Sequence, residues 1–319
     1  MKAPFILAIA LALVAPPALA QKYPDHPIRL IVPFPAGGPT DIVARVLSQA
    51  MSASLGQAIV IENRGGAGGV NGTDAVAKAA PDGYTLALTS AGALAISPAL
   101  QKVPYDWRRD LQPVILAVKA PEMLVAPASL GVKTVPEFIA AAKAKGSSFN
   151  FGSTGTGSMS HLSAELFRTA AGLEMTHVPY SGAAPALNDL LPGRLQMLFL
   201  DIQVLRPHVA SGALNALGVG GATRFPQLPD VPTIAEQGLT GFEAANWYGI
   251  VAPAATSPDI IEKLRAAASG ALQAGPAREA LTNLGATIMG EGPVAFAEYI
   301  SAESVKWAAV VKASGAKLE

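Results

Sequence analysis

Residues 28–55 read IRLIVPFPAGGPTDIVARVLSQAMSASL, and this stretch decides the fold class. The β-branched run at 28–32 predicts a strand, and residues 33–39 form a loop rich in Pro and Gly. From 40 to 55 the apolar residues recur at helical spacing, which predicts an amphipathic helix. The chain therefore opens with a strand, a glycine loop and a helix in succession.

The same unit recurs further along the chain. Strands are predicted over 58–61, 85–88 and 149–151. Loops rich in Gly, Ser or Thr follow these strands at 65–72, 89–92 and 152–158. Helices are predicted over 73–79 and 159–169. Parallel strands need crossover connections, so strands that alternate with helices predict an α/β protein with mostly parallel sheets.

Charge and cysteine content exclude several classes of protein. The 319 residues contain 23 Lys and Arg against 23 Asp and Glu, and no Cys. A balanced charge without a basic cluster argues against a nucleic-acid binder. The absence of Cys excludes disulfides, thiolate zinc sites and cysteine nucleophiles.

Cofactor motifs are also missing. No loop carries the Gly-Lys-Ser/Thr of a phosphate-binding loop, and the glycine-rich stretch 66–72 has Asn71 where a dinucleotide fingerprint has its last glycine. His161 and Glu165 lie four residues apart, a spacing that suits metal ligands but that more often marks a hydrogen-bonded pair. We expect neither a metal nor a cofactor.

The N-terminus predicts export. Lys2 precedes an uninterrupted apolar run at 5–14, and Ala18-Leu19-Ala20 has the small-x-small form of a signal-peptidase site. We expect residues 1–20 to be a signal peptide, cleavage after Ala20 and a periplasmic protein. The remaining chain is as long as the roughly 250–300 residues at which single cores stop growing, which favours two lobes.

Two segments are candidate crossings between these lobes. Strand-like runs at 114–118 and 123–125 are separated by residues 119–122, where Pro121 would interrupt a regular ladder, and the second crossing falls within 238–251. We expect lobe 1 to comprise 21–122 and 240–319, and lobe 2 to comprise 123–239. The last helices, over 258–273 and 293–313, would then pack on lobe 1.

The loops are where binding is expected, because ligands of open α/β sheets lie beyond the carboxyl ends of the strands. Residues 154–158, Thr-Gly-Thr-Gly-Ser, place hydroxyls and unobstructed amides at a helix start, which suits a carboxylate or phosphate. Gly37 and Gly38 could touch a ligand or only form a tight turn, and Asp41 could be an ordinary first-turn acid. Asp201 follows an apolar strand and could either contact a ligand or cap the next helix.

The succession of motifs resembles the Bug-type periplasmic solute receptors of tripartite tricarboxylate transporters. The motifs are Tyr23-Pro24 with the stretch 27–38, ENRGGAGG at 62–69, DGYTL at 82–86, FGSTGTGS at 151–158 with SHL at 160–162, VPYSG at 178–182, and WYG at 247–249 with Pro253. The resemblance implies a two-lobe periplasmic binding protein of type II, a Venus flytrap without enzymatic activity. Its partners would be a small organic carboxylate and the membrane subunits of such a transporter or a sensor. We expect a monomer.

The resemblance also implies which residues bind the ligand. They lie in two facing loops and a few further positions: Phe34, Ala36, Gly37, Gly38, Asp41, Ser90, Ala91, Thr154, Gly155, Thr156, Gly157, Ser158, His161 and Asp201. Family members often carry another residue where Ser181 stands. The alternative from a different class is a periplasmic enzyme that acts on carboxylates with Ser158 and His161, although residues so near in sequence do not automatically form a nucleophile and base pair.

Overall fold

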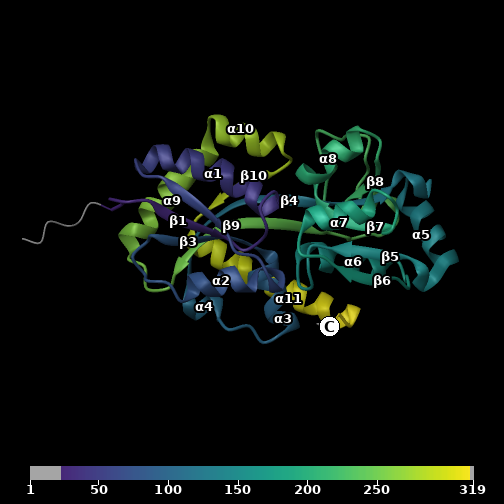
Figure 1. Cartoon of the computed structure of the whole chain (residues 1–319), viewed down its shortest axis with the longest axis horizontal. Helices are drawn as coiled ribbons and strands as arrows, with labels where there is room; N and C mark the ends of the chain where they lie inside the picture. The colour runs from purple at the N-terminus through teal and green to yellow at the C-terminus, as the bar shows by residue number, and fades with distance from the viewer. Residues whose placement is uncertain (1–22, 317–319) are drawn as a thin grey trace, which may run out of the picture.

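The computed structural model describes residues 23–316, so the expected signal peptide and its cleavage site lie outside the described residues. Among the residues described, no helix is both long enough and apolar enough to span a bilayer. Two lobes lie side by side along the long axis (Figure 1). Strands alternate with helices in both lobes, as expected from the sequence for an α/β protein of two lobes.

The sheet of lobe 1 begins with three parallel strands. β1 (Ile28–Val32) lies between β2 (Ile59–Asn63) and β3 (Thr85–Ser90). Beyond β3 come β9 (Ala245–Pro253), the first part of β4 (Leu111–Pro127) and β10 (Thr287–Glu291), each antiparallel to its neighbour. The sheet is therefore mixed and not mostly parallel as the sequence led us to expect, because the long strands that link the lobes enter it antiparallel.

The sheet of lobe 2 repeats this arrangement. β5 (Asn150–Ser153) lies parallel to both β6 (Thr176–Pro179) and β7 (Met197–Asp201). β7 and β8 (Leu214–Val219) each pair antiparallel with the second part of β4. In both lobes the parallel strands end at the cleft, and the loops that follow them face the other lobe.

β4 runs through both lobes without a break, which differs from the two shorter strands expected there. Up to Pro121 it pairs with β9, and from Glu122 onward it pairs with β7 and β8. The proline is tolerated because the partner strand changes at this point, so its missing N–H interrupts no continuous ladder. β4 and β9 are visible as the long ribbons that join the lobes in Figure 1.

Helices cover both faces of each sheet. In lobe 1, α1 (Pro39–Leu55), α9 (Pro258–Gln273) and α10 (Pro276–Asn283) lie on one face, and α2 (Val70–Ala77), α3 (Ser97–Leu100) and α4 (Trp107–Asp110) lie on the other. In lobe 2 the helices are α5 (Val135–Lys145), α6 (Met159–Ala170), α7 (Ala183–Leu190) and α8 (Ile202–Ala210). Pro39, Pro258 and Pro276 begin their helices, where a missing N–H costs nothing.

The last helix, α11 (Pro293–Ser314), contacts both lobes, whereas the sequence led us to expect contact with lobe 1 alone. It packs on β4 and on α6, and Arg168 Nη2 of α6 donates to the carbonyl oxygen of Ser314 at 3.0 Å. Its buried face carries Phe296, Ile300 and Trp307, which belong to a hydrophobic cluster that continues into lobe 2. α11 is therefore a third connection between the lobes, besides β4 and β9.

Candidate functional site

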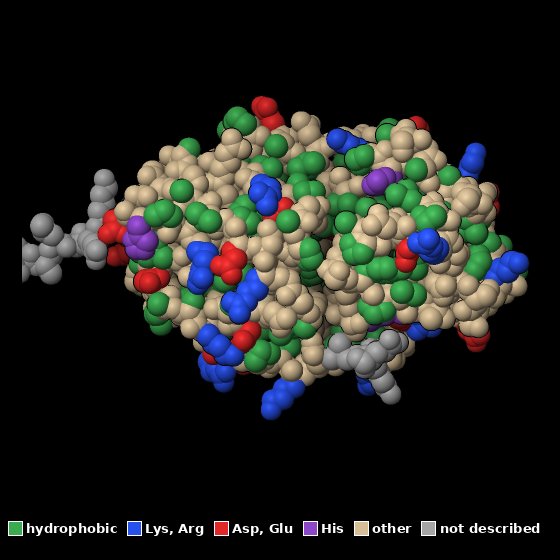
Figure 2. Space-filling view, viewed as in Figure 1, with side chains coloured by type: hydrophobic (Ala, Val, Ile, Leu, Met, Phe, Trp, Pro, Cys, Tyr) green, Lys and Arg blue, Asp and Glu red, His purple; other side chains and the backbone are tan. Residues whose placement is uncertain are grey.

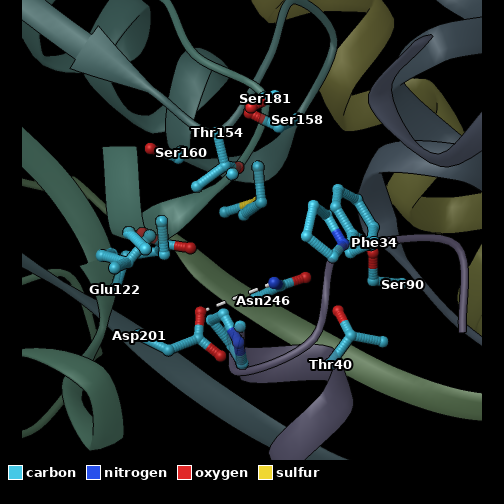
Figure 3. A pocket seen from close by; sticks show the side chains of 18 of the residues that line it. Phe34, Thr40, Ser90, Glu122, Thr154, Ser158, Ser160, Ser181, Asp201 and Asn246 are labelled. Carbon is cyan, nitrogen blue, oxygen red and sulfur yellow. Dashed lines mark hydrogen bonds between the residues drawn. The ribbon is translucent and has the colours of Figure 1, made fainter. Parts of the chain in front are cut away.

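A pocket lies between the lobes at the ends of the parallel strands (Figure 3). Its empty volume is about 630 Å³, counted together with the solvent at its mouth. The lining comes from β1–α1, β3, β4, β5–α6, β6–α7, β7 and β9. Its residues are Phe34, Pro35, Ala36, Gly38, Pro39, Thr40, Ser90, Glu122, Thr154, Ser158, Met159, Ser160, Ser181, Gly182, Ala183, Ala184, Pro185, Leu200, Asp201, Asn246 and Tyr248.

The first wall is the loop between β1 and α1, which supplies Phe34, Ala36 and Gly38. Asp41 lies behind this loop, not in the lining. Its carboxylate accepts from the Gly37 amide at 2.9 Å and from Arg45 Nε at 2.8 Å. Burial opposes the ionisation of Asp41, but these bonds and one from Asn63 outweigh it and lower the pKa of the carboxyl group.

Asn63, which the sequence did not single out, completes this support. Its Nδ2 donates to the carbonyl oxygen of Phe34 and to Asp41 Oδ1, both at 3.0 Å. Gly37 has φ of +78°, and a Cβ added there would meet no atom within 4 Å. Gly37 and Asp41 therefore hold the conformation of the loop, while their neighbours form the surface of the pocket.

The second wall is the loop between β5 and α6, from which Thr154 and Ser158 line the pocket. Ser158 is the N-cap of α6, and its Oγ accepts from the backbone N–H of His161 at 3.2 Å. Gly155, Thr156 and Gly157 form the turn between the two lining residues, and both glycines have positive φ. They lie outside the lining.

His161 also lies behind the wall. Its ring stacks on His177 with 4.0 Å between centroids, and Nδ1 accepts from the Gly157 amide at 3.3 Å. Burial, with smaller contributions from His177 and Arg168, lowers the pKa of His161 to about 3, so the ring is neutral. Ser158 Oγ accepts from the backbone N–H of His161 and does not bond to its ring, so the two residues do not form a nucleophile and base pair.

A third wall was not among the expected site residues. Ser181, Gly182 and the first residues of α7 line the pocket. Gly182 stands directly before its helix, as Gly38 does before α1, and Gly157 precedes the N-cap of α6; this recurrence of glycine is the signal that could have identified the third wall. A Cβ at Gly182 would lie 3.1 Å from Pro35 Cγ, so this loop also touches lobe 1.

Ser90 lines the pocket at the end of β3, whereas the next residue, Ala91, is fully buried and does not. Figure 3 shows Phe34, Thr40 and Ser90 across the cavity from Thr154, Ser158 and Ser181. Together with the N-termini of α1, α6 and α7, these hydroxyls form a donor-rich concavity of the kind that binds anions.

Among residues 23–316, no Lys, Arg or His lines this pocket. Figure 2 shows basic and acidic side chains interspersed on the face in view, without a basic cluster at the seam between the lobes. The part of the chain that the structure describes also contains no group of three His, Cys, Asp or Glu that could hold a metal ion. An anion here would be held by amides, hydroxyls and helix dipoles.

Acidic and polar side chains of β4, β7 and β9 form the floor. Glu122 and Asp201 are cross-strand partners of β4 and β7, and each is about 1% exposed. Asp201 accepts from the Tyr248 hydroxyl and, at 3.5 Å, from Asn246 Nδ2. Asp201 is the residue before α8, but its side chain makes no hydrogen bond to the backbone amides of that helix. Its carboxylate therefore belongs to the floor of the pocket and does not cap the helix.

Burial, the charge of Asp201 and a hydrogen bond to it raise the pKa of Glu122 well above its usual range. Burial also raises the pKa of Asp201, against the hydrogen bonds that it accepts. Two buried carboxyl groups that share a hydrogen bond cannot both ionise readily, so Glu122 keeps its proton to a higher pH than Asp201 and can donate it to the Asp201 carboxylate.

Three glycines outside the lining form a second contact between the lobes. A Cβ added at Gly68 would lie 2.9 Å from the carbonyl oxygen of Thr156, and one added at Gly92 would lie 3.3 Å from that of Gly157. We call Gly68, Gly92 and Gly157 the glycine contact. Gly68 belongs to the stretch that imitated a dinucleotide fingerprint, and here it allows two backbones to approach closely.

Comparisons with known proteins agree with this architecture. The protein BugT of Bordetella pertussis (strain Tohama I) is 41% identical over 313 residues, which cover 98% of this chain and 96% of BugT. A protein of Pseudomonas sp. (strain P51) is described as the UPF0065 protein in the tcbD-tcbE intergenic region. It is 39% identical over 303 residues, and the alignment covers 94% of this chain and 90% of that protein.

Solved structures match over most of both chains. The Rhodopseudomonas palustris protein Rpa4515 with adipate has a TM-score of 0.90 at 35% identity, covering 93% of this chain and 100% of its own. MatC of the same organism with bound malate has a TM-score of 0.86 at 36% identity, covering 91% and 100%. The periplasmic binding protein BugD has a TM-score of 0.88 at 34% identity, covering 93% and 100%.

The family model described as the tripartite tricarboxylate transporter family receptor, TctC, matches residues 43–316. That match includes the second and third walls and the whole floor of the pocket. The first wall precedes it but lies within the full-length similarity to BugT. This chain therefore belongs to the tripartite tricarboxylate transporter family of receptors.

Proposed function

We propose that the chain is a periplasmic receptor that captures a small organic carboxylate between its lobes and has no enzymatic activity. It would pass the ligand to the membrane subunits of a tripartite tricarboxylate transporter or to a sensor. The observation that carries the proposal is the pocket itself, whose walls come from both lobes and offer hydroxyls and three helix N-termini to an anion. Adipate and malate, bound to two similar proteins, are both carboxylates.

Ligand-driven closure is the mechanism we propose. Lobe 1 would comprise residues 21–122 and 240–319, and lobe 2 residues 123–239, because β4 changes its partner strands at Glu122. A carboxylate held by Phe34–Gly38 from one side and Thr154–Ser158 from the other would stabilise the closed arrangement. Hydrogen bonds to a charged acceptor contribute roughly 1.5 to 3 kcal/mol each, so such a site needs no Arg.

A thermal-shift screen of mono- and dicarboxylates tests this function. A ligand at a hundredfold excess over its Kd adds about 2.7 kcal/mol of stability. At roughly 2 to 4 °C per kcal/mol for a chain of this size, the melting temperature should rise by several degrees. Small-angle scattering with the best acid should show a smaller radius of gyration.

The matched control is the amide of the best acid, which keeps the shape and loses the anionic oxygen. We expect little stabilisation by the amide. Equal stabilisation by amide and acid, or an unchanged radius at saturation, would refute carboxylate capture. The NMR spectrum of the acid should be unchanged after prolonged incubation with the protein. Conversion of the acid would instead support the alternative of a periplasmic enzyme that acts on carboxylates.

Cleavage of the expected signal peptide can be tested separately. If the signal peptide is cleaved after Ala20, N-terminal sequencing of protein from the periplasmic fraction should begin at Gln21. A mature protein that retains Met1 would contradict export by this route.

A further inference from the structure

Two buried acids lie opposite each other at the floor of the pocket. Glu122 and Asp201 are cross-strand partners, their carboxyl groups share a hydrogen bond, and both residues line the pocket. Two buried carboxyl groups that share a hydrogen bond cannot both ionise readily, so they hold a proton between them. A cationic ligand group that replaced this proton would allow both carboxylates to be charged.

The floor can accept hydrogen bonds but has few left to donate. The Tyr248 hydroxyl donates to Asp201, and Asn246 Nδ2 donates to Tyr248 Oη at 2.8 Å and to Asp201. Ser160 Oγ donates to the Phe199 carbonyl oxygen at 2.6 Å. A second carboxylate placed here would find its possible donors already engaged and would face Glu122 and Asp201.

The two ends of the pocket therefore differ in chemistry. The walls present free hydroxyls and helix N-termini, which suit a carboxylate, whereas the floor presents two carboxyl groups with no basic side chain of the described lining to balance them. A group that carries several N–H donors and a positive charge complements such a floor.

We propose that Glu122 and Asp201 bind an ammonium group at the far end of the ligand, so that the receptor selects amino carboxylates over dicarboxylates. This inference rests on the proposed function, because the walls must hold the carboxylate end. On binding, the proton shared by the two acids leaves to solvent, and the ligand's N–H groups take its place between the carboxylates.

Calorimetry with matched ligands of two lengths tests the inference. The pairs are 4-aminobutanoate with succinate and 6-aminohexanoate with adipate. In each pair the amino acid has a carbon bearing an ammonium group where the diacid has its second carboxylate. Butanoate and hexanoate are the controls that lack a polar group at the far end. We expect at least one amino acid of these pairs to bind about tenfold or more tightly than its diacid. In buffers of different ionisation enthalpy at pH 7, its binding should release close to one proton.

Glu122→Gln removes the charge while keeping the shape. It should weaken binding of the amino acid about tenfold or more, abolish the proton release and narrow the preference over the diacid. Glu165→Gln is the matched control, since Glu165 is also buried but is paired with Arg168 outside the pocket. The control should keep both the preference and the proton release, and melting curves check that both variants are folded.

The outcomes separate the two proposals. If a diacid or a plain monoacid binds wild type better than the amino acids, or no proton is released, the ammonium site is refuted while the carboxylate receptor stands. If no acid binds in this set or in the wider carboxylate screen, the proposed function fails and the ammonium site fails with it.

Discussion

Replacing Gly68 by valine should weaken carboxylate binding by about a hundredfold or more, which corresponds to about 2.7 kcal/mol. Gly68 does not line the pocket, but a Cβ there would lie 2.9 Å from the Thr156 carbonyl oxygen and 3.1 Å from the Gly157 carbonyl carbon. Backbone atoms of the opposite lobe cannot turn aside as a flexible side chain can. A valine side chain would therefore hold the lobes apart, and titration calorimetry would measure the loss.

Gly56→Val is the matched control for backbone strain. Gly56 has φ of +69°, close to the +64° of Gly68, yet a Cβ there would meet no atom within 4 Å. Both variants should lose stability, because a β-branched residue adopts this conformation poorly. Only Gly68→Val should lose affinity, and equal affinity of the two variants would show that the glycine contact plays no part in closure.

Replacing Trp307 by alanine should lower the free energy of unfolding by about 3 to 5 kcal/mol, the usual cost of deleting a buried large aromatic side chain. Trp307 is fully buried on α11, and its Nε1 donates to Glu303 Oε2 at 2.9 Å. The same oxygen accepts from Trp247 Nε1 of β9 at 3.2 Å, so the substitution also weakens the attachment of α11 to the sheet.

Urea unfolding followed by far-ultraviolet circular dichroism measures the effect. Val305→Ala is the control on the same helix, because Val305 is 74% exposed and its truncation should change stability by no more than about 0.5 kcal/mol. Similar midpoints for the two variants would mean that α11 contributes little to the folded state.

Local patterns predicted the elements well, because strands and helices here follow simple periodicity. The helix expected over 258–273 has those bounds in α9, and the helix expected over 159–169 is α6 within one residue. Pro121 misled the prediction, because a proline indicates a break in a strand only when the same partner strand continues past it. That change of partner is a property of the sheet and cannot be read from residues 111–127 alone.

The binding residues were harder to predict than the elements. A loop contributes both lining residues and residues that hold it in shape, and sequence spacing does not separate Phe34 and Gly38 from Gly37 and Asp41. Glu122 was not predicted to bind, because residues 119–122 looked like a connection between two strands, where an acid suits an exposed position. Only the pairing of β4 with β7 brings it opposite Asp201.

The lack of a cationic side chain in the described pocket lining affects how fast the receptor works as well as what it holds. Amide and helix dipoles act over short distances, so a ligand would arrive by diffusion without long-range attraction, and its capture rate would depend little on ionic strength. Release would require no buried ion pair between a ligand carboxylate and a basic side chain to be broken. Opening of the lobes would then set the residence time of that carboxylate.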